Sequence, residues 1–439
     1  MSQQAVALAA LILICPCSVA QATAARFDRQ IQAYVRNHDF SGSVLVVKDG
    51  RVLFQKSYGM ANYEWGIPNS EKTKFHIASV TKTFTAAAIL RLEKQGKLKL
   101  SDSLSQYVPD FLNGERITIE QMLSHTSGLP DYYSLPEYAM RKYQRVTLPD
   151  LIAWVKTKPL DFLPGSKSSY SNTGYAFLAY IIEQVSGKSY ERFLADEILK
   201  PAGLNDTGTF RDESLIPNRA AGYQPGVGEQ GLRNAPFYDK AILTGSGSLY
   251  STTGDLYAWC REVQAKFFDP RQATPAYGWG THETRSKHRY IEQSGRDPGF
   301  ASHVSFFPED RLAVIVLGNL EDAAVNTIAE DLAAITFGED PEPPALRARA
   351  SVPAHPADYA GTYEVNPTFL LDIRVERGAL YLRGTGGDYL PLEPTGKDSF
   401  FYRQLYVKVG FKRDKAGKIE ALLWNGDYPC RKVSSVVSR

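Results

Sequence analysis

The sequence predicts an α/β protein of the α+β type, in which helices flank an antiparallel sheet and a small all-β unit follows. Strand-like segments occur early, at 42–48 and 51–56, and again at 300–307 and 312–317. The region between them consists mainly of helical segments and of loops rich in Gly and Pro. Strands from both ends of this region are therefore expected to build one sheet, with the helices packed around it.

The individual elements follow from local signals. Asp49-Gly50 separates the first two strands and is a strong hairpin signal. A helix is expected over 83–95 with Gly96 as its stop, because its first half is apolar nearly all round. A closing helix that packs on the sheet is indicated by apolar residues on one helix face: Ile328, Leu332 and Ile335.

A linker and a second domain are predicted after residue 337. The segment 338–349 contains Gly338 and several prolines, which break helices and strands alike. Over 350–439 apolar residues alternate at strand period between turns, which predicts a small antiparallel barrel or sandwich. Three roles stay open for it: to wall the active-site cleft, to bind a ligand, or to stabilise the chain. With a leader at 1–24, the main domain spans 25–337.

The first residues have the pattern of an export signal. The run from Ala5 to Ile14 is apolar but too short to span a bilayer, and small residues at 18–20 and 22–24 suit cleavage. We therefore expect a periplasmic or secreted protein with no transmembrane span. The two cysteines beyond the leader, Cys260 and Cys430, are compatible with one disulfide or with two buried thiols.

Composition limits the classes of partner. The chain has 439 residues and a formal net charge of +2, with no basic stripe, which argues against a nucleic-acid partner or an anionic membrane surface. Its seven histidines show neither His-Glu-x-x-His nor Cys/His ligand spacing, so we expect no metal and no cofactor. The charge does not indicate a substrate; the motifs described next predict a small-molecule or peptide substrate as the partner.

The most informative motif is Ser79-Val-Thr-Lys82. Residues three apart share one helix face, so the Lys82 amine can activate the Ser79 hydroxyl as a nucleophile. Because the helix start is apolar, burial disfavours the charged lysine and makes it a proton acceptor near neutral pH. Taken alone, the motif is far more typical of a helix start with an exposed lysine.

A second motif, Tyr170-Ser171-Asn172, lies in a polar loop that leads into an apolar helical stretch. A tyrosine hydroxyl near Ser79 can relay its proton, and Asn172 can orient Lys82 and a substrate amide. The alternative for this motif alone is an Asn helix cap beside a packed tyrosine. Together, the two motifs favour a catalytic site.

With these residues in place, the chain resembles the penicillin-binding and class C β-lactamase-like serine hydrolases over most of 35–335. Three long segments extend the match, and they contain Gly96 to Pro109, Met122 to Pro130 and Ile182 to Phe193. The resemblance implies a β-lactamase/DD-peptidase-like fold with a helical subdomain, and it places Ser79 where the subdomain meets the sheet. The C-terminal domain resembles the lipocalin-like tail of some of these hydrolases.

The third family motif departs from the usual pattern. Family members carry a Lys or His, a small residue and a Gly on a strand beside the site, where this chain has Gln293-Ser294-Gly295-Arg296. The resemblance assigns these four residues to substrate binding and pairs the backbone N–H of Arg296 with that of Ser79 as an oxyanion hole. Gln293 removes the cation that attracts a substrate carboxylate. Candidates to replace that cation are Arg296, His282, His288 and His303.

Two functions are compatible with these observations. The first is a serine hydrolase that forms an acyl-enzyme with small amides or esters, with D-amino-acid peptides, β-lactams and simple esters all open. The second is a non-catalytic penicillin-binding-like protein that binds or acts as a scaffold. The enzyme is favoured because the chain has all four residues of the two motifs that the proposed chemistry uses: Ser79, Lys82, Tyr170 and Asn172. Gln293 modestly favours the alternative, and it makes a strong β-lactamase the less expected kind of enzyme.

Overall fold

The computed structural model describes residues 16–433 except for 212–213, 226–230, 267–276, 348–349, 352, 367–368 and 386–388. The apolar segment Ala5 to Ile14 of the predicted leader lies outside the described residues, and helix α1 (Pro16–Arg36) begins just after it. Within the described part, no helix is both long and apolar enough to cross a membrane.

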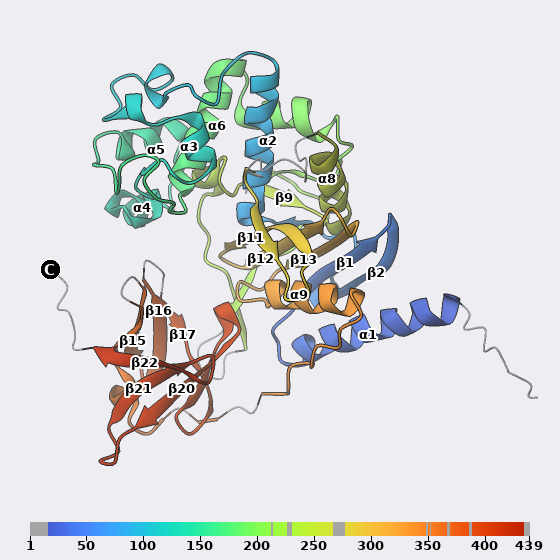
Figure 1. Cartoon of the computed structure of the whole chain (residues 1–439), viewed down its shortest axis with the longest axis vertical. Helices are drawn as coiled ribbons and strands as arrows, with labels where there is room; N and C mark the ends of the chain where they lie inside the picture. The colour runs from blue at the N-terminus through green and yellow to red at the C-terminus, as the bar shows by residue number, and fades with distance from the viewer. Residues whose placement is uncertain are drawn as a thin grey trace, which may run out of the picture.

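A six-stranded antiparallel sheet in the order β10-β11-β12-β13-β1-β2 forms the centre of the larger part of the molecule (Figure 1). Its strands are β1 (Gly42–Lys48), β2 (Arg51–Tyr58), β10 (Gly280–Glu283), β11 (Arg289–Asp297), β12 (Phe300–Phe307) and β13 (Leu312–Gly318). Gly42 lies opposite Gly318 and Lys48 opposite Leu312, so the first strand pairs with the last. The predicted sheet built from both ends of the region is confirmed.

Both faces of this sheet are covered. Alternate residues of a strand point to opposite faces, so Val44 and Val46 share one core with α1 and α9 (Val325–Thr336), the predicted closing helix. Leu45 and Val47 belong to the other core, on the side of α8 (Thr253–Lys266). Burial on both faces explains why β1 reads as a continuous apolar run instead of an alternating one.

A helical subdomain lies beside the sheet, at the top of Figure 1. Its helices are α2 (Thr81–Lys94), α3 (Ile119–Leu123), α4 (Pro136–Arg141), α5 (Leu148–Val155), α6 (Asn172–Ser186) and α7 (Tyr190–Leu194). Helix α2 is buried through most of its length and ends before Gly96, whose φ of 68° is a left-handed conformation that suits glycine. Short strands connect these parts: β3 (Met60–Asn62), β4 (Ile67–Pro68), β5 (Phe75–His76), β6 (Gly208–Thr209), β7 (Tyr223–Pro225), β8 (Leu232–Asn234) and β9 (Leu249–Ser251).

A separate nine-stranded antiparallel sheet forms the C-terminal part of the chain, in the order β17-β16-β15-β14-β22-β21-β20-β19-β18. Its strands are β14 (Gly361–Asn366), β15 (Phe369–Glu376), β16 (Ala379–Gly384), β17 (Leu390–Pro391), β18 (Glu393–Gly396), β19 (Ser399–Tyr402), β20 (Val407–Arg413), β21 (Ile419–Trp424) and β22 (Tyr428–Val433). The two edge strands, β17 and β18, are adjacent in the sequence, with only Leu392 between them. The Leu392 N–H donates to Leu380 O on β16 at 2.9 Å. The sheet therefore curls into a nearly closed barrel, which confirms the predicted all-β unit.

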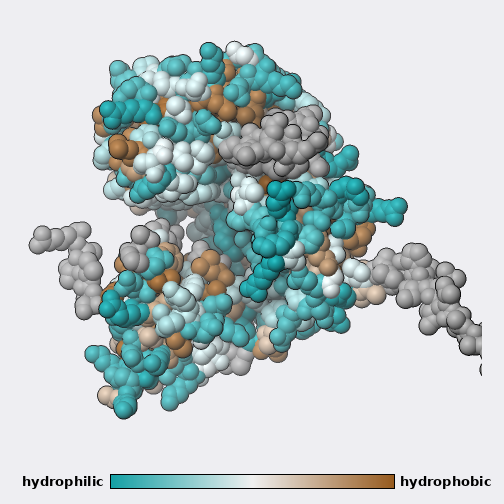
Figure 2. Space-filling view, viewed as in Figure 1, coloured by the Kyte–Doolittle hydropathy of each residue, from teal (hydrophilic) through white to brown (hydrophobic). Residues whose placement is uncertain are grey.

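The barrel interior is a packed core. Buried apolar side chains from its strands fill it, among them Tyr363, Leu371, Leu382 and Leu422. Cys430 lies in this core, whereas Cys260 is buried beside the sheet and the helices; both are free thiols. Figure 2 shows that the molecule is hollowed between the helical subdomain and the barrel.

Candidate active site

Ser79 lies in a short 3₁₀ turn, Ala78–Val80, directly before helix α2. Ala78 has a φ of 43°, and a non-glycine residue in the left-handed region costs roughly 1–3 kcal/mol, so the turn persists only because its surroundings hold it. Part of that support comes from the sheet, since Ser302 Oγ on β12 donates to Ile77 O at 2.8 Å. Ser79 is thereby held where the helical subdomain meets the sheet.

Lys82 lies one helical turn after Ser79 and is fully buried. Its Nζ donates to Ser79 Oγ at 3.0 Å, to Asn172 Oδ1 at 2.8 Å and to Ser246 O at 2.8 Å. Burial lowers the pKa of Lys82 to about 7, although the negative charge of Asp131 opposes this shift. Near neutral pH, a large share of Lys82 is thus the uncharged amine that can accept a proton.

Tyr170 faces the same oxygen from the opposite loop. Its hydroxyl donates to Ser79 Oγ at 2.7 Å, and its ring centroid lies 4.7 Å from Lys82 Nζ. Loss of water around the hydroxyl raises the pKa of Tyr170 well above its ordinary value, and the charge of Asp131 raises it further. The phenol therefore stays protonated at neutral pH and can donate a proton to a leaving group.

Asn172 is the first residue of α6, and its side chain is directed to Lys82. The residue that caps the helix is Ser171, whose hydroxyl accepts from Gly174 N at 3.2 Å. The alternative in which Asn172 caps the helix is therefore wrong, and its amide is available to hold the lysine. The helix cap and the lysine contact are made by adjacent residues.

Two residues outside the predicted set hold this loop. His125 stacks on the Tyr170 ring at 4.7 Å, and its Nδ1 accepts from Ser171 N at 3.1 Å. Asp131 Oδ2 accepts from both the backbone N of Asn172, at 2.7 Å, and its side-chain Nδ2, at 3.0 Å. Burial, with a smaller contribution from the charge of Lys82, lowers the pKa of His125 to about 4, so its imidazole is neutral and can accept.

The sequence carried a signal for both residues. His125 lies inside one of the segments that extend the family resemblance, and Asp131 directly follows that segment. No local spacing connects Asp131 with Asn172, because the two are 41 residues apart. Their contact depends on how the loop before α4 folds over the start of α6.

Strand β11 passes beside Ser79 and carries the third motif. Gln293 Nε2 donates to Ser79 O at 3.2 Å. A Cβ at Gly295 would lie 2.3 Å from Ile77 O and 2.8 Å from Ser79 N, so only glycine allows the strand to come this close. Ser294 and Arg296 point to the other face, because residues alternate along a strand. Ser294 Oγ pairs with His303 Nδ1 at 2.9 Å.

None of the candidates for the missing cation faces the Ser79 hydroxyl. The Arg296 guanidinium donates to Glu321 O at 2.7 Å and to Ala323 O at 3.1 Å, on the side of the strand away from Gln293. Of the two alternatives for Arg296, a substitute cation or a solvated side chain, the structure supports neither, because the guanidinium is bound to these two carbonyls. The three histidines have other partners: His282 lies 3.3 Å from Glu292, His288 lies 2.9 Å from Asp310, and His303 is buried behind β11.

The pKa of Lys82 predicts how activity depends on pH. If the neutral amine is the base, kcat/KM for an uncharged ester should rise with pH, with a midpoint near 7, because the amine loses its proton there. The raised pKa of Tyr170 predicts no loss of activity on the alkaline side below about pH 9. A pH–rate profile from pH 5 to 9 measures both limbs, and a rate that falls as pH rises through 7 would contradict the assignment of Lys82.

Among the described residues, no group of three or more His, Cys, Asp or Glu side chains is arranged to hold a metal ion. The polar groups around Ser79 are instead the amine, phenol and amide described above. They form a proton-transfer site around a hydroxyl.

Two family models match separate parts of this chain. The family model described as Beta-lactamase matches residues 27–337, and a domain of unknown function, DUF3471, matches 346–433. Penicillin-binding protein 4* of Bacillus subtilis (strain 168) is 29% identical over 413 residues, which cover 85% of this chain and 90% of that protein.

Two solved structures share the fold. A penicillin-binding protein from Bacillus halodurans has a TM-score of 0.59 at 27% identity and covers 70% of this chain and 98% of its own. A class C beta-lactamase has a TM-score of 0.59 at 19% identity, with 74% of this chain and 98% of its own covered. Because the Beta-lactamase model spans well over half of the sequence, this chain belongs to the beta-lactamase family.

Proposed function

We propose that this protein is a serine hydrolase that acts through an acyl-enzyme on small amide or ester substrates. The observation that carries the proposal is the double contact at Ser79 Oγ, which lies 3.0 Å from Lys82 Nζ and 2.7 Å from Tyr170 OH. One group has a lowered pKa and the other a raised pKa, which suits a proton acceptor and a proton donor at one hydroxyl.

In the proposed first half-reaction, Ser79 Oγ attacks the substrate carbonyl carbon and its proton passes to Lys82. The backbone N–H groups of Ser79 and Arg296 hold the negative charge that develops on the carbonyl oxygen. Tyr170 then donates its proton to the departing amine or alcohol and regains one from Lys82, which leaves an ester on Ser79. In the second half-reaction water attacks this ester, the same groups transfer its proton, and Ser79 is released with the acid product.

The proposed substrates are D-amino-acid peptides, β-lactams or simple esters. The penicillin-binding names of relatives favour the first two classes. Gln293 favours substrates without a carboxylate at the position where family members place a cation, since an amide gives no net attraction to an anion. We therefore infer that neutral esters and amides are turned over better than β-lactams.

One experiment tests the proposal on the full chain. The protein is exposed to a fluorophosphonate or to a penicillin and its intact mass is measured, while turnover of p-nitrophenyl acetate is followed in parallel. A stoichiometric adduct on Ser79 together with turnover supports the hydrolase. An adduct without turnover would favour the binding or scaffold function instead, and neither adduct nor turnover would overturn the catalytic assignment.

Restoring a cation at position 293 should change substrate preference. Gln293→Lys or Gln293→His is expected to raise activity on β-lactams or D-alanyl peptides relative to neutral esters by about tenfold or more, because a charge-assisted hydrogen bond contributes roughly 1.5–3 kcal/mol. The ratio of kcat/KM values for the two substrate classes measures this. Thr281→Lys, which adds the same charge at an exposed position of the neighbouring strand β10, is the matched control. An equal shift in the control would attribute the effect to overall charge.

A further inference from the structure

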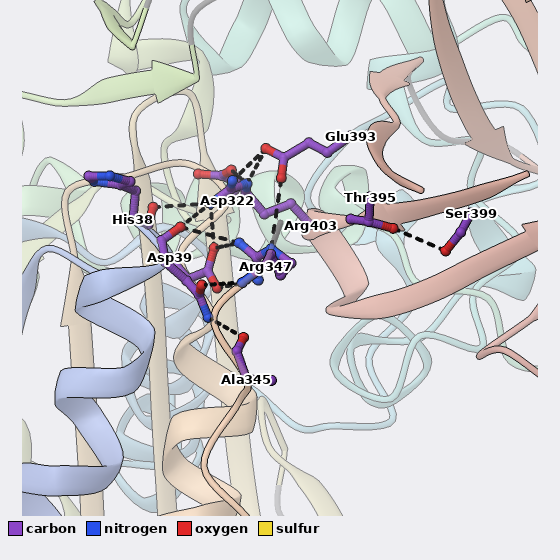
Figure 3. Close-up of polar contacts among 10 residues, drawn as sticks. His38, Asp39, Asp322, Ala345, Arg347, Glu393, Thr395, Ser399 and Arg403 are labelled. Carbon is purple, nitrogen blue, oxygen red and sulfur yellow. Dashed lines mark hydrogen bonds and ion pairs between the residues drawn. The ribbon is translucent and has the colours of Figure 1, made fainter. Parts of the chain in front are cut away.

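The C-terminal barrel meets the rest of the protein at a cluster of charged side chains, drawn in Figure 3 and called the joint here. The barrel contributes Glu393 on β18 and Arg403 directly after β19, and the linker before the barrel contributes Arg347. The other side contributes Asp39, between α1 and β1, and Asp322, in the loop 319–324 between β13 and α9. The joint therefore connects segments from both ends of the sequence.

Arg403 is the centre of the joint. Its Nε lies 3.0 Å from Asp322 Oδ2 and its Nη2 lies 2.5 Å from Glu393 Oε1, while its Nη1 contacts Asp39 and donates to His38 O at 3.1 Å. These are well-shielded charges, because Asp39 is fully buried and the side chains of Arg403 and Asp322 are only 15% and 13% exposed. A buried carboxylate that loses its counterion is strongly destabilised, so each acid here depends on its arginine.

In the sequence, Asp322 lies between the two residues whose backbone carbonyls bind Arg296. The Arg296 guanidinium on β11 donates to the carbonyl oxygens of Glu321 and Ala323, the residues on either side of Asp322. The Glu321 carboxylate in turn accepts from Gly299 N at 3.2 Å, in the turn between β11 and β12. The loop 319–324 thus holds the β11–β12 hairpin at two points, and Arg403 holds that loop through Asp322.

From this continuous set of contacts we propose that Arg403 of the C-terminal barrel is a positioning residue for β11, the strand that passes beside Ser79 and carries the proposed oxyanion N–H of Arg296. The proposal rests on the proposed hydrolase function, because it concerns the oxyanion hole of that reaction. It assigns the barrel a part in the active site without any barrel side chain contacting the substrate.

The electrostatics of the loop explain why the effect should reach β11. Burial raises the pKa of Asp322 to about 6, and the charge of Arg403 is the main influence that opposes this shift. Without Arg403, the pKa of Asp322 rises further, and the Asp322 carboxylate is stable only if the loop 319–324 moves toward solvent. Arg296, which donates to Glu321 O and Ala323 O in that loop, moves with it and displaces β11 relative to Ser79. Small displacements of oxyanion donors are costly, since removal of one donor lowers kcat by about 10²–10³-fold.

The test compares two arginines of the joint in the full-length protein. Arg403→Ala is expected to lower kcat for p-nitrophenyl acetate by about tenfold or more with little change in KM, because an oxyanion hole acts in the transition state. The matched control is Arg347→Ala, which removes a cation that pairs with Asp39 but has no contact with Asp322 in the described structure. The control is expected to keep a kcat near wild type.

A second variant separates positioning from simple loosening of the barrel. Asp322→Asn in the Arg403→Ala background removes the unpaired charge, so kcat is expected to recover toward wild type in this double-mutant cycle. If Arg403→Ala does not fold, Arg403→Lys replaces it, since lysine keeps the charge but not the planar fork that reaches several acids. A lower kcat in Arg403→Lys, restored by Asp322→Asn, supports the proposal in the same way.

Three results would overturn the proposal: a wild-type kcat in the Arg403 variant, an equal loss in Arg347→Ala, or no recovery on adding Asp322→Asn. Wild-type protein is assayed first for fluorophosphonate labelling and turnover. Absence of both in the wild type would refute the hydrolase function itself, which distinguishes that failure from a failure of the coupling between barrel and strand.

Discussion

Ser79→Ala is expected to abolish turnover and covalent labelling while leaving the fold intact. The hydroxyl is the only group at this position that can form the acyl-enzyme, so kcat should fall by several powers of ten. The fold should persist because Ser79 Oγ contacts Lys82 Nζ and Tyr170 OH at the surface of the site, while the turn is held by backbone and sheet contacts. Covalent labelling is measured by intact mass after fluorophosphonate treatment, and turnover is measured with p-nitrophenyl acetate. Thermal unfolding shows whether the fold is intact.

A serine outside the site provides the matched control for this change. Ser43 on β1 is buried, and its hydroxyl contacts Ser57 Oγ at 2.8 Å and Ser70 O at 3.1 Å. Ser43→Ala should therefore affect unfolding temperature but not labelling. Labelling of Ser79→Ala at the wild-type level, or turnover near wild type, would show that another residue is the nucleophile.

Tyr170→Phe is expected to lower kcat by about 10²–10⁴-fold with little change in KM, the range typical of a lost general acid or base. Phenylalanine keeps the ring that stacks on His125 and removes only the hydroxyl that contacts Ser79 Oγ. The loop should therefore keep its position, and the loss would belong to proton transfer. Steady-state kinetics with an amide and with an ester measures the effect.

The two substrates make this test sharper. An amide should lose more activity than an ester with a good leaving group, because only the amine needs a proton as it departs. Tyr175→Phe is the matched control: Tyr175 also lies against His125, at 5.1 Å, but its hydroxyl donates to Leu123 O and not to Ser79. A change in KM alone would instead identify Tyr170 as a packing residue.

Much of the fold was accessible from local patterns. Asp49-Gly50 marks the hairpin between β1 and β2, and the helix predicted over 83–95 lies within two residues of α2 (Thr81–Lys94). The predicted pairing of early and late strands is also confirmed, since β1 pairs with β13. A strand pair from the start of the domain and one from its end form a single sheet only if a strand of one pair bonds to a strand of the other. The barrel strands follow from alternation at period two.

The site was predictable only in part. Ser79 and Lys82 are neighbours on one short turn and helix, which follows from the helix repeat alone. Asp131 was missed, since its contact with Asn172 spans 41 residues and depends on loop packing. Arg296 was one candidate for the missing cation, whereas its side chain is held on the opposite face of β11.

The sequence by itself determined the fold class, the pairing of Ser79 with Lys82 and the absence of a cation at position 293, because periodicity, helix spacing and residue type are local properties. Only the tertiary structure decided which groups hold them in place. Arg296 bonds to residues 25 and 27 positions away, and Arg403 contacts Asp39 across 364 positions. Such contacts depend on the register of β11 and on how the barrel docks, and no short segment of the chain encodes either one.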